Sequence, residues 1–174
     1  GSYIPFYRLD RKLIFQATGW VSSATAGLAR GEKAIANYDE DAITMAVAAG
    51  MDCTRTAKSQ SIAGVYLAST TLPYRERLNA GIVCSALDLS PETRSADFAS
   101  SLRAGTSAVL AALDGLASRE DESILVLASD CRLGKVGSPQ EHMFGDGAAA
   151  FLIGAQDPIA SYIGSYSLTY DFMD

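Results

Sequence analysis

The strongest indication of the fold in this sequence is the segment Phe144-Gly145-Asp146-Gly147-Ala148-Ala149-Ala150-Phe151-Leu152-Ile153. Gly145 and Gly147 flank Asp146, so backbone freedom and a side-chain hydrogen-bond acceptor meet at one turn. The apolar run that follows is not interrupted by a charge, which is typical of a strand covered on both faces. We expect a structural loop here, in which Asp146 forms hydrogen bonds and does not transfer protons.

Outward from this strand, the sequence alternates between strand and helix patterns. Asp39, Glu40 and Asp41 favour a helix start, and the apolar spacing after them predicts a buried helical face of Ile43, Ala46, Val47, Gly50 and Met51. Strands are predicted over residues 62–68, 95–100, 124–128 and 159–169, the last with Tyr162, Tyr166, Leu168 and Tyr170 on one face. Helices are predicted over residues 79–89 and 101–118, while residues 15–36 are ambiguous. The alternation predicts an α/β fold in layers.

The composition is that of a globular protein with a single domain over residues 1–174. Hydrophobic residues make up 48% and charged residues 20% of the 174 residues, which allows a sizeable core. The net charge of −6 argues against a nucleic-acid partner, which requires a basic face. No apolar stretch reaches the roughly 18 residues of a membrane helix, and no signal peptide opens the chain. We therefore expect a cytoplasmic protein without a membrane partner.

The three cysteines lack the spacing of a zinc site or of a disulfide framework, so we expect neither. Cys84 lies among small and apolar residues, which favours buried packing. Cys53 lies beside Asp52, and the sequence guarantees no cation that would activate it. Cys131 follows Ser129-Asp130 at a strand end, where α/β sheets place functional groups.

Three segments together resemble the thiolase superfamily, and within it the hydroxymethylglutaryl-CoA synthase-like branch. They are Ala36-Asn37-Tyr38-Asp39-Glu40-Asp41, Ala68-Ser69-Thr70-Thr71-Leu72-Pro73-Tyr74 and Met143-Phe144-Gly145-Asp146-Gly147-Ala148-Ala149, the last of which is also similar to ketoacyl synthase III. Their order and separation match the amino-terminal half of such enzymes over nearly the whole chain. The resemblance implies a thiolase-like half, with a mixed five-stranded sheet and helices in layers, and a carboxy-terminal half that is absent from this chain.

The resemblance also implies a chemistry. Family members use a cysteine thiolate that accepts an acyl group from a CoA or carrier-protein thioester, which a second acyl group then attacks as a carbanion or enolate. Matching Ala104-Gly105-Thr106 to the family's small-Gly-Thr segment places Leu102 at the position of that cysteine. The glutamate general acid/base would correspond to Thr70, and the family's His and Asn belong to the second half. The usual catalytic set is therefore not expected in this chain.

Two residues remain as candidate nucleophiles. Ser101 adjoins the position of Leu102 and lies at the start of the predicted helix. Two roles are open for it: a nucleophile that forms an acyl-serine, and an ordinary N-cap. Cys131 is the other candidate, and a role in packing is the alternative to a catalytic role for it as well. His142 matches neither family residue, and a surface or loop role is expected for it. Candidate CoA-binding cations are Lys33, Arg103, Arg132 and Lys135, with Trp20 as a stacking surface, although each would also serve as a solvated surface residue.

Three functions remain open, none of which requires a cofactor beyond the thioester substrate. The first is an acyl-thioester enzyme that forms carbon–carbon bonds on acyl-CoA or acyl-carrier protein. The second is a retro-aldolase-type relative, in which phenols or bound water replace the thiolate. The third is a catalytically silent partner subunit. The resemblance implies a homo- or heterodimer that pairs through the strand from Ser95 to Ser100.

Overall fold

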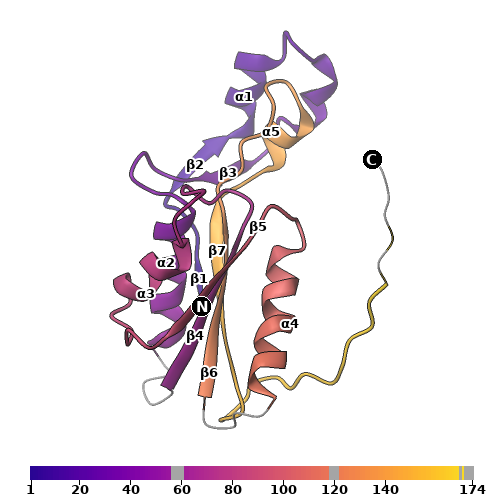
Figure 1. Ribbon diagram of the computed structural model, residues 1–174. Coiled ribbons are helices and arrows are strands. Elements are labelled where there is room, and N and C mark those ends of the chain that lie inside the picture. Colours follow the sequence, from indigo (N-terminus) through magenta and orange to yellow (C-terminus); the bar gives the residue numbers. More distant parts are fainter. Residues whose placement is uncertain (56–60, 118–121, 169, 171–174) are drawn as a thin grey trace.

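The computed structural model of the protein describes residues 1–55, 61–117, 122–168 and 170. A five-stranded sheet in the order β1-β7-β6-β4-β5 forms its centre (Figure 1). Strands β4 (Ser61–Ser69), β5 (Arg94–Ala99) and β6 (Glu122–Asp130) are parallel. Strand β7 (Gly147–Gly154) is antiparallel to β6 and to β1 (Ser2–Tyr3). The mixed five-stranded sheet that the resemblance implies is confirmed.

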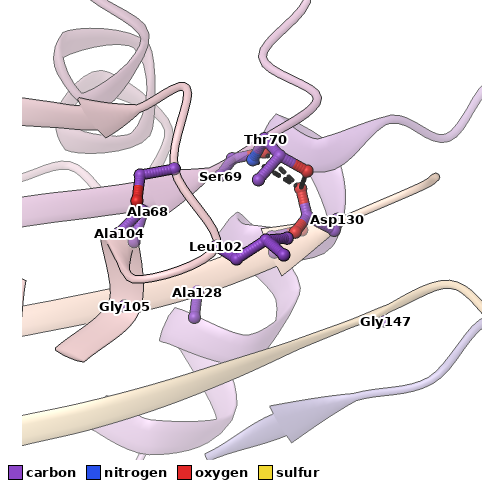
Figure 2. A pocket seen from close by; sticks show the side chains of 11 residues that line it. Ala68, Ser69, Thr70, Leu102, Ala104, Gly105, Ala128, Asp130 and Gly147 are labelled. Carbon is purple, nitrogen blue, oxygen red and sulfur yellow. Dashed lines mark hydrogen bonds between the residues drawn. The ribbon is translucent and has the colours of Figure 1, made fainter. Parts of the chain in front are cut away.

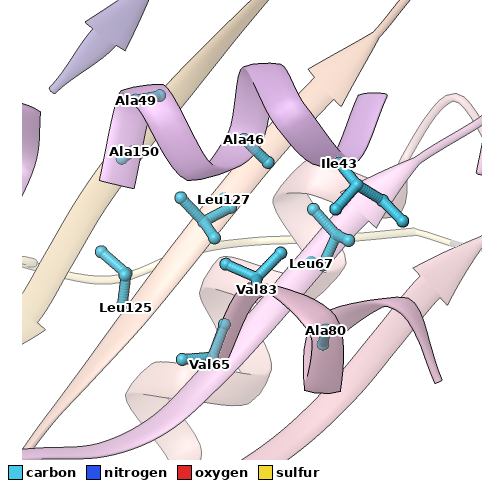
Figure 3. Close-up of a cluster of buried hydrophobic side chains, with 10 residues drawn as sticks. All are labelled: Ile43, Ala46, Ala49, Val65, Leu67, Ala80, Val83, Leu125, Leu127 and Ala150. Carbon is cyan, nitrogen blue, oxygen red and sulfur yellow. The ribbon is translucent and has the colours of Figure 1, made fainter. Parts of the chain in front are cut away.

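Helices cover both faces of the sheet. Helices α2 (Ala42–Thr54) and α3 (Asn79–Ala86) pack on one face, over a buried cluster shown in Figure 3: Ile43, Ala46, Ala49, Val65, Leu67, Ala80, Val83, Leu125, Leu127 and Ala150. Among the described helices, α4 (Ala104–Leu116) is the one that covers the opposite face (Figure 1). Three alanines of α4, Ala104, Ala108 and Ala112, pack on Ile124 and Val126, so the helix axis lies close to the strands.

A smaller lobe lies beyond one end of the sheet, at the top of Figure 1. It consists of β2 (Tyr7–Asp10) and β3 (Glu32–Ile35), which pair antiparallel, the helix α1 (Arg11–Thr18), the 3-10 helix η1 (Ser23–Leu28) and α5 (Pro139–Met143). The ambiguous residues 15–36 thus form most of this lobe.

The start of α2 is fixed by a capping box. The Asp41 carboxylate accepts hydrogen bonds from the N–H groups of Ile43 and Thr44, and the Thr44 hydroxyl accepts one from the Asp41 N–H. The predicted start is therefore confirmed. The predicted buried face was wrong at Met51, which is 60% exposed. The predicted Ile43, Ala46 and Gly50 are buried, together with Ala42, Met45 and Ala49, and Met51 lies outside this buried face.

The other predicted elements differ from the structure mainly at their ends. The helix expected over residues 101–118 runs over Ala104–Leu116, with residue 118 outside the described residues, and the helix expected over 79–89 ends at Ala86. The strand expected over residues 159–169 was wrong: residues 159–168 are irregular, and residue 169 lies outside the described residues. Ile159 and Ile163 are fully exposed, and no described strand lies beside this segment to pair with its backbone.

Within the described residues, every helix is too short or too polar to cross a membrane.

Candidate active site

The strand order reverses beside β4. The chain passes from β4 to β5 on one side, and then crosses back over β4 to reach β6 on the other. In open α/β sheets, ligands bind at such a switch point, outside the carboxyl ends of the strands. A pocket of about 300 Å³ lies there (Figure 2). Its lining residues are Ala68, Ser69, Thr70, Ser101, Leu102, Ala104, Gly105, Ala128, Ser129, Asp130 and Gly147.

Asp130 organises one wall of this pocket. Its Oδ1 accepts hydrogen bonds from the Ser69 hydroxyl at 2.9 Å and from the Thr70 N–H at 2.7 Å. The hydroxyls of Thr70 and Thr71 donate to the same oxygen, each at 3.0 Å. These four neutral donors fix the carboxylate between the ends of β4 and β6 (Figure 2).

The junction between β5 and α4 forms another wall. Ser100 has a φ of +62°, a conformation that non-glycine residues rarely adopt, and it turns the chain from β5 into the segment before α4. Leu102 follows at the pocket with 78% of its surface exposed. The Ser101 hydroxyl accepts a hydrogen bond from the Arg103 N–H at 3.1 Å, and α4 begins at Ala104. The junction that resembles the acyl-handling segment therefore lies at the pocket.

The Gly145-Asp146-Gly147 turn joins the pocket to the small lobe. The Asp146 carboxylate accepts a hydrogen bond from the Ala36 N–H at 2.7 Å, and the Asp146 N–H donates to the Ala34 carbonyl at 3.1 Å. Gly147 lines the pocket, and a Cβ there would lie 3.2 Å from the Tyr3 carbonyl oxygen. The turn thus ties the start of β7 to the chain at the end of β3.

Cys131 lies next to the pocket but does not line it. Its N–H donates to the Thr71 hydroxyl at 3.0 Å, and its Sγ lies 3.8 Å from the same oxygen. Burial raises the pKa of the Cys131 thiol, although the contact with Thr71 opposes this shift. A raised pKa keeps the thiol protonated at neutral pH, which is the opposite of what a nucleophile needs.

The predicted CoA-binding cations lie outside the pocket lining. Lys33 donates to the Glu141 carbonyl at 2.7 Å, and the Arg132 guanidinium stacks over the Phe144 ring at 4.3 Å. Lys135 is exposed, and Arg103 is the N-cap residue of α4, beside the pocket. Trp20 is exposed on the small lobe. The structure therefore brings Thr70, Ser101 and Leu102 together at the pocket, whereas the four cations and Trp20 do not line it.

His142 departs from the expected surface or loop role. It lies in α5 and is fully buried, where α5 packs against η1 and α1. Neither ring nitrogen has a hydrogen-bond partner among the described residues. The burial of His142 was not predicted from the sequence, because residues 15–36, which pack against α5, showed no helical pattern. Cys84 and Cys53, in contrast, pack against the core on the α2 and α3 face, as expected for Cys84.

Asp130 is the pocket residue that the sequence analysis missed. The signal was present, because Ser129-Asp130 ends an apolar strand and polar residues at such ends are candidates for function. Among the described residues, no group of His, Cys, Asp and Glu has the arrangement of a metal site.

No protein-family model matches the chain. Over its whole length, however, the chain is 33% identical to the hydroxymethylglutaryl-CoA synthase of Pyrococcus furiosus, of which it covers 49%. It is also 33% identical to the hydroxymethylglutaryl-CoA synthase of Methanocaldococcus jannaschii, of which it covers 51%. The chain thus spans about half the length of the curated relatives that it matches.

Solved structures agree with this relationship. A hydroxymethylglutaryl-CoA synthase complexed with CoA superposes with a TM-score of 0.79 and 27% identity, over 91% of this chain and 41% of that chain. A 3-oxoacyl-(acyl-carrier-protein) synthase III superposes with a TM-score of 0.78 over 94% of this chain and 51% of that chain. At 19% identity, the second likeness shows the fold alone.

The fold and the position of the pocket define a thiolase-like half. Within that class, the chain is similar over its whole length to the amino-terminal half of hydroxymethylglutaryl-CoA synthases. The resemblance carried by its three motifs is therefore confirmed.

Proposed function

We propose that this chain forms the acyl-binding pocket of a thiolase-superfamily protein that acts on CoA or carrier-protein thioesters in carbon–carbon bond chemistry. The observation that carries the proposal is the pocket itself. It lies at the switch point of the sheet, and the segments that resemble the family's catalytic junction and glutamate loop both line it. Similarity to hydroxymethylglutaryl-CoA synthases supports the condensing-acyltransferase class of reaction.

Leu102 sets a limit on the mechanism. On the resemblance it stands at the position of the acyl-accepting cysteine, and none of the three cysteines of the chain lines the pocket. We therefore propose that the thioester is bound in this pocket without transfer of its acyl group to a cysteine of this chain. The retro-aldolase-type alternative shares this feature, because it needs no thiolate.

Calorimetric titration of the full-length protein with acetyl-CoA tests the proposal. We expect saturable binding, and we expect Leu102→Trp to weaken it at least about tenfold because the indole fills the pocket. Leu13→Trp is the matched control, since Leu13 is also an exposed leucine but lies on α1, away from the pocket. Absence of binding, or equal binding by the Leu102→Trp protein, would refute the proposal. Absence of binding together with a stable complex with a related subunit would favour the silent-partner alternative.

We also propose that a second, carboxy-terminal half completes the protein. The chain spans about half the length of its relatives. Large apolar side chains are exposed beside α4 and beyond β7, among them Phe151, Ile159 and Ile163. A second layer that packs on this side would remove them from water.

Strand β5 is the proposed dimer contact. It lies at one end of the strand order and pairs only with β4 among the described strands, so its other edge is open to a partner strand. We expect light scattering to give a dimer for the full-length protein and a monomer for Ala96→Lys, whose charge opposes pairing at this edge. A monomeric unsubstituted protein would contradict this contact.

A further inference from the structure

The two oxygens of the Asp130 carboxylate have different surroundings. Oδ1 accepts all four hydrogen bonds from Ser69, Thr70 and Thr71. No described residue donates a hydrogen bond to Oδ2, and no described Lys, Arg or His forms an ion pair with Asp130. One oxygen is therefore held in place while the other is left to accept a proton or a hydrogen bond from a ligand.

Asp130 also lies where the resemblance leads one to expect a carboxylate. The family's glutamate would correspond to Thr70, and Thr70 donates both its N–H and its hydroxyl to Asp130. A carboxylate from β6 thus contacts the residue that corresponds to the family's glutamate, across the switch point (Figure 2).

We propose that Asp130 is the catalytic base of this pocket and that it removes a proton from the α-carbon of a bound acyl thioester. This inference rests on the proposed function and names the group that performs its first step. The Cα–H bond breaks, the proton passes to Oδ2, and the electron pair moves into the thioester carbonyl to give an enolate. Return of a proton from Asp130 to the same carbon restores the thioester, so the partial reaction needs no second substrate.

Two features of the pocket suit this step. Its other walls are mostly small or apolar, including Leu102, Gly105 and Ala128, which leaves room for an acyl chain. Helix α4 begins at Ala104 in the same wall, so the positive end of its dipole lies beside the position where enolate charge develops.

The experiment follows deuterium incorporation into the methyl group of acetyl-CoA in D₂O, by mass spectrometry, with the full-length protein. Acetyl-CoA binding is measured in parallel. We expect catalysed exchange by the unsubstituted protein, and a loss of at least about 100-fold in Asp130→Asn with binding unchanged. Asp114→Asn, at an exposed carboxylate on α4, is the matched control and should exchange normally.

The outcomes separate this proposal from the one on which it rests. Binding without exchange, or normal exchange by Asp130→Asn, overturns the role of Asp130 and leaves the proposed function standing. Absence of binding overturns both. If Asp130→Asn does not fold, Asp130→Glu decides the question, because moving the carboxylate by one methylene should slow exchange by about tenfold or more. Unchanged exchange in that folded variant would show that Asp130 has only a structural role.

Discussion

The Asp97 carboxylate on β5 accepts two hydrogen bonds from Asn79, one from its N–H and one from its side-chain amide, each at 2.8 Å. It also accepts the Ala80 N–H at 2.7 Å, so a strand supplies the cap that α3 lacks from its own N-cap residue. The loop between β4 and α3 is thereby fixed at both ends, by Asp130 at its start and by Asp97 at its end. The pocket wall at Thr70 belongs to this loop.

Removal of the Asp97 acceptor should destabilise the protein. In Asp97→Ala, the N–H groups of Asn79 and Ala80 lose their acceptor, while the Asn79 side-chain amide keeps the carbonyls of Tyr74 and Arg77, and we expect a loss of about 2 kcal/mol in the free energy of unfolding. Asp97→Asn keeps an acceptor oxygen and should lose less. Urea denaturation measures both, and equal stability of Asp97→Ala and the unsubstituted protein would contradict this role.

The Cys131 thiol should react slowly at neutral pH. Because burial disfavours the thiolate, its pKa is raised, and alkylation should rise with pH to a midpoint above the ordinary value of about 8.5. The same shift predicts that the contribution of this thiol to stability is complete below the ordinary pKa and is lost as the pH rises through the raised pKa.

Iodoacetamide labelling of a Cys53→Ser, Cys84→Ser protein isolates this thiol. The pKa of Cys84 is also raised, mainly by burial, which is why it must be removed for the measurement. A labelling midpoint below pH 7 would identify Cys131 as an activated thiolate and restore it as a candidate nucleophile.

Replacement of Leu102 by cysteine should create an acyl acceptor. In Leu102→Cys the thiol would lie at the pocket, close to the positive end of α4, which lowers the pKa of a thiol. We expect intact-mass spectrometry to find one acetyl group on this variant after incubation with acetyl-CoA, and none on the unsubstituted protein. Ser101→Cys, one residue away, is the control for position. If Leu102→Cys binds acetyl-CoA but stays unmodified, the alignment of this junction with the family is wrong.

Packing of α4 on the sheet should tolerate little added volume. Ala108 is fully buried between α4 and the strands, so the larger side chain of Ala108→Leu would force the helix away from β6. We expect a loss of about 1–3 kcal/mol in the free energy of unfolding, measured by urea denaturation. Asp114→Asn on the exposed side of the same helix should change it little. An Ala108→Leu protein of unchanged stability would mean that α4 is not held closely on the sheet.

Local patterns predicted the elements whose determinants lie close together in the sequence. The capping box of Asp41 and Thr44 is contained within one helical turn, and the start of α2 was correct for that reason. The strand that follows Gly145-Asp146-Gly147 was predicted correctly as β7, but its expected cover on both faces was wrong, because Ala150 is buried while Phe151 is 61% exposed. The strand predicted over residues 159–169 was wrong for the described residues 159–168, although their sequence pattern is that of a strand. A strand also needs a neighbouring strand to pair with its backbone N–H and carbonyl groups.

The pocket could not be predicted from local sequence patterns, because it is formed by contacts between residues that are far apart in the sequence. Asp130 and Thr70 are 60 residues apart in the sequence, and only the parallel pairing of β4 with β6 brings them together. The family resemblance placed Thr70, Ser101 and Leu102 at one site, because the family motifs that these residues match meet at one site in the fold. It did not point to Asp130, which the hydrogen bonds at the end of β6 reveal.

Photo-crosslinking tests the central claim most directly, because it locates the acyl group. The full-length protein is irradiated with a CoA thioester whose acyl chain carries a diazirine, and the labelled peptides are identified by mass spectrometry. Our account predicts labels on the peptides that contain Leu102 and Ala128, with loss of both in the presence of excess acetyl-CoA. Labels confined to the small lobe around Trp20, or labels that acetyl-CoA does not displace, would contradict it.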